Sequence, residues 1–281
     1  MTEEKKRAIL CPNCGKLIST SETICPHCGL SKPTSKWKNN PLTKGMADEK
    51  TLLWSIISIN IGIYMLSLLL YPRAMGVAMN PLTMFSPSTQ SLLLLGATGT
   101  YPVDQFGRWW SLVSANFLHG SILHILFNML ALRQLGPLVI REFGSYRMLI
   151  IYLVGGTAGF FVSYVAGVTV TIGASAAVCS LIGAALFYGK SRGGVYGQVI
   201  FRQVGGWVIG LFIFGLLIPG INNWGHGGGL IAGALLGMVL GYHEKTMENS
   251  NHKLIALVCV FTTVLILAWA VITTLFYRIG G

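Results

Sequence analysis

Five polar side chains lie within or at the edge of segments of the sequence that are otherwise apolar: His119, His124, Asn128, Ser175 and His226. A polar or ionisable group is costly to bury in hydrocarbon, so each such residue is a candidate for a functional site. A serine hydroxyl can be activated as a nucleophile by a histidine imidazole, provided that the two groups reach hydrogen-bond distance. Whether they meet depends on the elements that carry them.

The composition indicates that those elements are membrane spans. Of 281 residues, 53% are hydrophobic and only 10% are charged, whereas a soluble domain carries about 25% charged residues. Nine of the twenty basic residues fall within residues 1–50. A basic tail beside a bilayer is explained by anionic lipid headgroups and by topology, so the net charge of +11 does not require a nucleic acid, and we expect none as a partner.

From Thr51 onward, apolar segments follow one another, each close to the roughly 20 residues that cross the hydrocarbon core. We therefore expect an all-α polytopic membrane protein. The predicted spans are 51–71, 118–140, 148–167, 173–189, 199–218, 225–242 and 254–276. The connection 72–117 is apolar but contains four prolines, which favours a partly embedded interfacial loop over a further span.

Lys and Arg residues are concentrated in alternate connections. With a cytoplasmic N-terminus, the inner connections hold Arg141, Arg147, Lys190, Arg192, Arg202, Lys245 and Lys253, whereas the outer ones before the seventh span hold only Arg73 and Arg108. This asymmetry follows the positive-inside rule. We expect a multi-pass protein of the cell membrane, in a prokaryotic plasma membrane, that interacts with the lipid bilayer and has its N-terminus in the cytoplasm.

The polar residues share one depth. Counting outward at 1.5 Å per residue from Arg141, Lys190 and His243, we place His124, Ser175 and His226 at roughly 22–26 Å from the inner face. They are thus near the outer face, on three different helices. Asn128 follows one turn below His124 on the same helix face.

Small residues indicate how two of these spans pack. Gly229, Gly233, Gly237 and Gly241 recur every four residues along the sixth span. The fourth span carries a complementary set, Gly173, Ala176, Ala177, Gly183, Ala184 and Ala185. Such faces let helix backbones approach closely in membranes. Pure packing explains them in part, but close approach is also what Ser175 and His226 would need to form a hydrogen bond.

Two cysteine pairs precede the spans, in CPNCG at 11–15 and CPHCG at 25–29. Cys11, Cys14, Cys25 and Cys28 form the closed set of four thiolates that suits a structural Zn²⁺ ion, with rubredoxin-like iron as the main alternative. We expect a zinc-ribbon module at 8–30, a cytoplasmic linker at 31–50 and a transmembrane domain at 51–276. The module resembles the zinc ribbons attached to many prokaryotic proteins.

Three motifs together resemble the rhomboid intramembrane proteases: GAS at 173–175, HGGGLIAGALLG at 226–237, and H-x4-H-x3-N at 119–128. The resemblance covers about 110–242. It implies a rhomboid-like bundle of six helices, with the seventh span added at the C-terminal end.

The resemblance implies a Ser–His dyad that acts without a cofactor as a serine endopeptidase. Ser175 would be the nucleophile and His226 the general base, while the Ser175 N–H, His124 and Asn128 would bind the oxyanion. His119 would brace the long loop, and Gly229 and Gly233 would support the close packing. The implied substrates are transmembrane proteins, cut in or near their membrane segments, which would reach the site past the fifth span.

Three positions depart from the family pattern: Ala176 replaces a glycine, Cys179 an aromatic that stacks on the histidine, and Ser111 an arginine. None removes a catalytic group, but they bear on how well His226 is oriented. The alternatives are a catalytically weak or inactive rhomboid-like binder of transmembrane clients and, from another class, a transporter or channel subunit with a zinc ribbon.

Overall fold

The computed structural model describes residues 8–12, 16–27, 29–35, 46, 48–71, 84–218 and 220–279. Most of them are helical. The long helices are α2 (Glu49–Leu70), α6 (Ile122–Phe143), α7 (Ser145–Val165), α8 (Ser175–Arg192), α9 (Gly194–Leu217), α10 (Asn223–Leu240) and α11 (Ser250–Ile279). The fold is thus helical as predicted, and one helix corresponds to each of the seven expected spans.

Five of these helices, α2, α6, α7, α9 and α11, are long and apolar enough to cross a membrane by length and composition. The chain is therefore a multi-pass membrane protein. The other two long helices, α8 and α10, have 18 residues each and carry Ser175 and His226. They differ from ordinary spans because they are short and carry glycines and polar residues. The prediction of seven spans did not distinguish these two helices from the other five.

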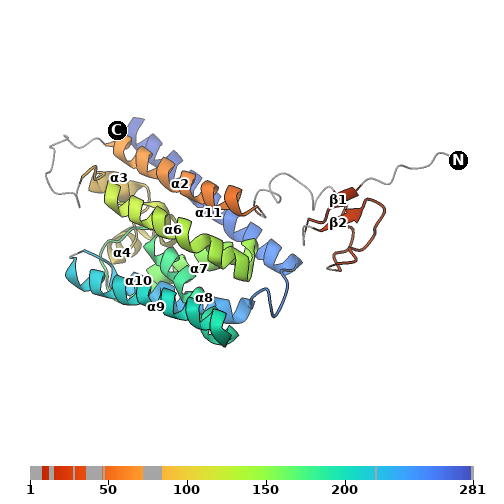
Figure 1. The fold of residues 1–281 in the computed structure, drawn as a ribbon. Coiled ribbons are helices and arrows are strands. Elements are labelled where there is room, and N and C mark those ends of the chain that lie inside the picture. Colours follow the sequence, from red (N-terminus) through yellow and green to blue (C-terminus); the bar gives the residue numbers. More distant parts are fainter. Residues whose placement is uncertain are drawn as a thin grey trace.

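The helices form a bundle around α7, α8 and α10 (Figure 1). The central helix α7 has buried residues on all sides, including Ile151, Tyr152 and Phe160. Helix α8 contacts α7, α10, α6 and α9, while α2 packs on α6 and α11 packs on α7. This arrangement places the N-terminal parts of α6, α8 and α10, which carry His124, Ser175 and His226, around one cavity.

The connection before α6 folds over one end of the bundle. Within its described part, 84–121, lie the short helices α3 (Thr89–Leu94), α4 (Thr100–Phe106) and α5 (Ser111–Ser114) and the 3-10 turn η1 (Ala115–Phe117). The described part of the predicted loop, 84–117, contains only these short elements, in agreement with an irregular loop, whereas the predicted span 118–140 begins four residues before α6. Thr98 pairs with Thr171 in an isolated antiparallel bridge, which ties this loop to the connection between α7 and α8.

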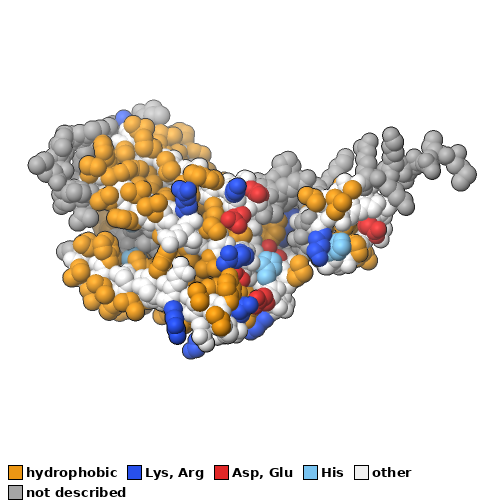
Figure 2. All heavy atoms as spheres, viewed as in Figure 1, with side chains coloured by type: hydrophobic (Ala, Val, Ile, Leu, Met, Phe, Trp, Pro, Cys, Tyr) orange, Lys and Arg blue, Asp and Glu red, His pale blue; other side chains and the backbone are white. Residues whose placement is uncertain are grey.

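Charged side chains gather at the opposite end of the bundle (Figure 2). We call this the basic end; it carries Arg141 in the last turn of α6, Lys190 and Arg192 in the last turn of α8, Lys245 beside Ser191, and Lys253 over Tyr146 at the start of α7. The segment between α10 and α11 closes this end. There the Glu248 carboxylate accepts a hydrogen bond of 2.8 Å from the Arg147 backbone N–H at the start of α7. Burial raises the pKa of the Glu248 carboxyl, and its hydrogen bonds to this helix start oppose that rise.

The N-terminal module contains a two-stranded antiparallel sheet of β1 (Ala8–Leu10) and β2 (Leu17–Ser19), in which Ile9 pairs with Ile18. Most of the predicted linker, residues 36–45 and 47, lies outside the described residues.

Candidate active site

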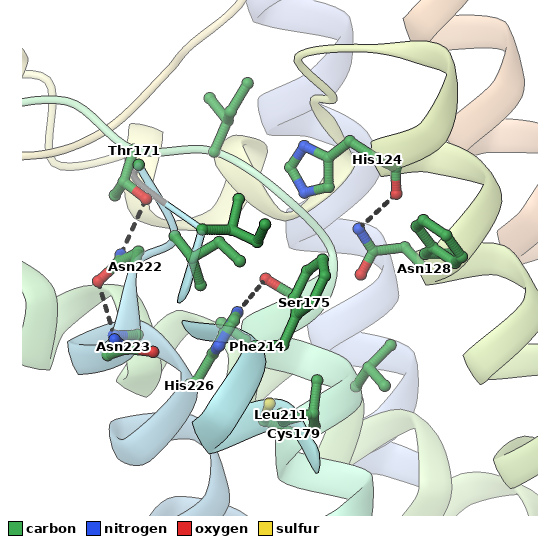
Figure 3. Close-up of a pocket in the computed structure, with 18 of the residues that line it drawn as sticks. His124, Asn128, Thr171, Ser175, Cys179, Leu211, Phe214, Asn222, Asn223 and His226 are labelled. Carbon is green, nitrogen blue, oxygen red and sulfur yellow. Dashed lines mark hydrogen bonds between the residues drawn. The ribbon is translucent and has the colours of Figure 1, made fainter. Parts of the chain in front are cut away.

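Ser175 and His226 are in direct contact. The Ser175 Oγ lies 2.9 Å from the His226 Nε2 (Figure 3). Ser175 is the first residue of α8, and His226 lies in the first turn of α10. The two residues are 51 positions apart in the sequence, so only the packing of their helices brings them together.

Gly173 forms the turn that leads into α8. Its φ of +127° is a conformation that favours glycine, and its N–H donates to the Ala115 carbonyl at 2.9 Å. A Cβ at this position would lie 2.7 Å from His124 Nε2. The glycine therefore allows both the turn before Ser175 and the close approach of the His124 ring.

Glycines let α8 and α10 pack backbone against backbone. A Cβ added at Gly229 would overlap the Ala176 carbonyl oxygen, and one at Gly233 would overlap the Ser180 carbonyl oxygen. From the other side, a Cβ at Gly183 would overlap the Leu230 carbonyl oxygen. The predicted packing faces thus meet in the structure, and they hold the serine and the histidine at contact distance.

The His124 ring is held by a backbone group. Its Nδ1 accepts a hydrogen bond of 3.3 Å from the Gly120 N–H. A neutral imidazole whose Nδ1 accepts carries its proton on Nε2. The same Nε2 is the atom that a Cβ added at Gly173 would approach most closely, at 2.7 Å, and Figure 3 shows the ring on the side of the pocket that faces Ser175.

Asn128 lies one turn further along α6, and its amide nitrogen donates to the His124 carbonyl at 2.9 Å. Figure 3 shows the His124 and Asn128 side chains on the same side of the pocket, facing Ser175. An amide nitrogen carries two hydrogens, so one bond to His124 leaves a second donor. These two residues and Ser175 therefore surround one space.

The second nitrogen of the His226 ring, Nδ1, is buried and has no hydrogen-bond partner among the described residues. In a triad this nitrogen would donate to a carboxylate. Cys179, one turn after Ser175, is also buried and lines the same pocket, where the family pattern has an aromatic ring. The orientation of His226 therefore depends on the helix that carries it.

Asn222, just before α10, fixes the start of that helix and was missed by the sequence analysis. Its side-chain oxygen accepts from the Gly225 N–H at 2.9 Å. Its amide nitrogen donates to Ser163 Oγ at 2.7 Å and to Thr171 Oγ1 at 2.8 Å. The pair Asn-Asn before a helix was a visible capping signal, but its distant partners could not be read from the sequence.

The remaining predicted support residue, His119, is fully buried at the junction between the loop and α6, with its ring edge-on to His124 at 5.1 Å between centroids. Ser111, the position that departs from the family pattern, donates to Thr98 Oγ1 at 2.8 Å. Arg108 reaches the Leu93 carbonyl at 2.9 Å. The loop is thus held beside the pocket by short polar contacts.

A cavity of about 1160 Å³ opens onto Ser175 and His226. Its walls come from α6, α8, α9, the connection 168–172 and the start of α10. Most of α9 is exposed, and its buried residues are Gly197, Ile200, Val204 and Gly215. The cavity is large enough to hold water and an extended segment of another chain.

The N-terminal module holds the second candidate site. Cys11 and Cys25 are buried in one small cluster with Ile18, and each begins an equivalent turn: the Cys11 N–H donates to the Lys16 carbonyl and the Cys25 N–H to the Leu30 carbonyl. Two matching turns with buried thiols fit the predicted thiolate site. The other two predicted ligands, Cys14 and Cys28, lie outside the described residues.

Comparison with known proteins finds two domains. Residues 106–243 match the family model described as Rhomboid domain, and residues 8–31 match the zinc-ribbon domain. Among similar proteins is Rhomboid protease GluP of Bacillus subtilis (strain 168), 36% identical over 160 residues, which are 56% of this chain and 31% of that protein.

Two plant proteins are also similar. RHOMBOID-like protein 4 of Arabidopsis thaliana is 35% identical over 57% of this chain and 41% of its own length. RHOMBOID-like protein 5 of the same plant is 30% identical over 66% of this chain and 65% of its own length. The chain spans less than two thirds of the length of these relatives. The segment that matches the rhomboid domain nevertheless includes the three motifs, both residues in contact, and every residue that lines the cavity except Ser86. The chain therefore carries a rhomboid domain, preceded by an N-terminal zinc-ribbon domain.

Proposed function

We propose that this chain is an intramembrane serine endopeptidase that hydrolyses peptide bonds in or near the transmembrane segments of other membrane proteins. The observation that carries the proposal is the 2.9 Å contact between Ser175 Oγ and His226 Nε2 at the floor of a large cavity. The names of the relatives support a protease in general terms, while the dyad rests on the geometry.

In this mechanism His226 Nε2 takes the proton of Ser175 as the hydroxyl oxygen attacks the scissile carbonyl. The oxyanion of the tetrahedral intermediate is bound by the Ser175 N–H, at the positive end of the α8 dipole, together with His124 Nε2–H and the Asn128 amide. His226 then protonates the leaving amine, and a water activated by the same imidazole hydrolyses the acyl-enzyme.

A transmembrane substrate would reach Ser175 from the side, between α6 and α9. The exposure of most of α9 supports this route, because only Gly197, Ile200, Val204 and Gly215 of this helix are buried. We also propose that the protein lies in a prokaryotic plasma membrane with its N-terminus and its basic end on the cytoplasmic side. The distribution of Lys and Arg supports this orientation.

A fluorophosphonate probe tests the dyad in the purified full chain. We expect the probe to label Ser175 and the His226→Ala variant to lose the labelling, because the hydroxyl is a weak nucleophile without its base. Equal labelling of both proteins would contradict the dyad. No labelling of either, together with tight binding of transmembrane segments, would instead favour the alternative of an inactive client binder, to which the unpartnered His226 Nδ1 also points.

Asn222 is expected to position His226. Replacing Asn222 with alanine removes three hydrogen bonds around the start of α10, and a small displacement of the general base should lower kcat about tenfold or more with little change in KM. Kinetics on a transmembrane substrate in detergent measures both constants.

The neighbouring residue provides a matched control, since the Asn223 amide bonds instead to the Gly215 carbonyl of α9 at 2.9 Å. We expect Asn223→Ala to retain kcat, and Asn222→Asp, which keeps the acceptor for the Gly225 N–H, to recover part of it. An Asn222→Ala variant with normal kcat would show that His226 does not depend on this cap.

We also propose that Cys11, Cys14, Cys25 and Cys28 hold a structural Zn²⁺ ion. A module of this size buries little apolar surface, so metal binding would supply much of its folding free energy. Elemental analysis of the purified chain should find about one zinc ion per chain, and iron in its place would contradict the assignment.

A further inference from the structure

The two-stranded sheet of the N-terminal module has apolar side chains on both of its faces. On one face, Ile18 of β2 is buried with Cys11 and Cys25. Side chains alternate between the two faces along a strand, so the neighbouring cross-strand pair, Leu10 and Leu17, lies on the opposite face. These two leucines are 63% and 65% exposed. The module therefore packs one face of its sheet around the cysteines and presents a second apolar face to its surroundings.

This second face, which we call the leucine face, consists of Ala8, Leu10, Leu17 and Ser19. Where one face of an antiparallel sheet is packed on a core, the other is commonly polar because it meets water. Here its two largest side chains are aliphatic, although the small core of the module is already formed on the other face. Exposed apolar clusters of this kind mark contacts with a protein or with a membrane.

Basic residues adjoin the leucine face along the sequence. The run KKR at 5–7 directly precedes β1, and Lys16, which is exposed, directly precedes β2. The one acidic residue within 8–35 is Glu22. Apolar side chains beside Lys and Arg are the combination that binds anionic lipid surfaces, because the apolar groups enter the boundary between headgroups and acyl chains while the cations meet the headgroups.

The chain keeps this module beside one particular leaflet. Helices α2 and α11 run in the same direction, since Arg278 in the last turn of α11 donates to the Leu69 carbonyl near the end of α2 at 2.9 Å. Helix α11 starts after the segment that closes the basic end, so α2 starts at that end as well. Glu49, the first residue of α2, follows Ser35 by fourteen residues, which span at most about 50 Å. Such a tether gives the module a high effective concentration of lipid, so a small contact surface suffices.

We propose that the leucine face docks on the anionic lipid surface of the leaflet at the basic end. Leu10 and Leu17 enter the headgroup region, and the charges of Lys16 and of the basic run 5–7 attract the lipid phosphates. A membrane fits this surface better than the flanking segment of a client protein does. In the proposed orientation such segments lie on the cytoplasmic side, where they are themselves rich in Lys and Arg, and the same lysines would repel them.

A photo-reactive benzoylphenylalanine in place of Ala8 tests the contact in the full chain, in vesicles of phosphatidylcholine alone or mixed with phosphatidylglycerol. Ala8 is exposed on the leucine face, so the probe leaves both leucines in place. We expect cross-links to phospholipid, with a yield about fivefold or more higher in the mixed vesicles. The same probe at Thr34 controls for tethering, because Thr34 is exposed and lies nearer to α2 along the chain, and its yield should be low in both.

Side-chain changes in the Ala8 probe protein separate the apolar from the charged contribution. Leu10→Asn combined with Leu17→Asn should lower the lipid yield about tenfold, because two apolar side chains no longer leave water. Lys16→Gln should lower it in the mixed vesicles only. Thr20→Asn, at the exposed turn after β2, should leave it unchanged. Elemental analysis of each variant should find the metal content of the parent protein, so that a lower yield reports the contact and not an unfolded module.

Equal lipid yields from the probes at Ala8 and Thr34 would overturn the proposal, and this comparison holds even where a leucine variant loses its metal. An unchanged yield in the double leucine variant would overturn it as well. Cross-links from Ala8 to a second protein chain or to the helices of the bundle, in place of lipid, would assign the leucine face to a protein contact instead. The result is independent of the dyad, since the probe in a Ser175→Ala protein should give the same lipid yield.

Discussion

Replacing Ser175 with alanine is expected to abolish hydrolysis of a transmembrane substrate, with kcat reduced by about 10⁴-fold or more. The Oγ removed is the atom that contacts His226 Nε2 at 2.9 Å, and no other hydroxyl in the described residues contacts that imidazole. The measurement is cleavage of a single-span model substrate in detergent and in liposomes. Thermal unfolding should change little, because Ser175 is only partly buried and its neighbours stay in place.

Ser180 provides the control within the same helix. Its Oγ is buried and donates to the Ile151 carbonyl of α7 at 2.8 Å, away from His226. Ser180→Ala should cost about 1 kcal/mol of stability, as a lost hydrogen bond does, and leave kcat close to the wild-type value. If Ser175→Ala kept measurable hydrolysis while Ser180→Ala lost it, the nucleophile would be wrongly assigned.

The position of the candidate site could be predicted because an α-helix advances regularly along the chain. Counting from basic residues placed Ser175 and His226 at one level, and glycine spacing identified the helix faces that meet. The contact in the structure follows from these two regularities. Neither depends on the loops, whose paths the sequence therefore predicts least well.

Asn222 illustrates what could not be predicted. Its partners lie 59 and 51 residues away: Ser163 is in α7, and Thr171 is in the connection between α7 and α8, where it also forms the bridge with Thr98. Such contacts arise only after the helices have packed. The start of α6 differs from the prediction for a local reason: the apolar run begins at Leu118, but Ser121 caps the helix through the His124 N–H, so His119 remains in the loop.

The departures from the family pattern fall at positions with different consequences. Ala176 is buried against Leu112, Ala115 and Phe160, where its methyl group fills space, and its carbonyl oxygen lies against Gly229. Ser111 keeps a polar contact with the loop through Thr98. Cys179 alone removes a neighbour of the His226 ring. The orientation of His226 therefore depends more strongly on the cap at Asn222 in this chain.

Replacing Gly233 with alanine is expected to disrupt the site without touching either catalytic side chain. The added methyl would overlap the Ser180 carbonyl oxygen of α8, and a backbone atom cannot rotate away as a side chain can. The helices must therefore separate, at a cost of about 1–3 kcal/mol for an overpacked contact. Because the contact between Ser175 and His226 depends on the close approach of α8 and α10, hydrolysis should fall at least tenfold.

Gly227→Ala is the matched change in the same helix, since a Cβ at Gly227 meets no atom within 4 Å. Alanine also has the higher helix propensity, by about 1 kcal/mol, so this variant should unfold at an equal or higher temperature and keep its kcat. Thermal unfolding in detergent, paired with the cleavage assay, separates the two cases. A Gly233→Ala protein as stable and active as Gly227→Ala would mean that α8 and α10 do not need their backbone contact, and that the dyad is held by the loops around Asn222 instead.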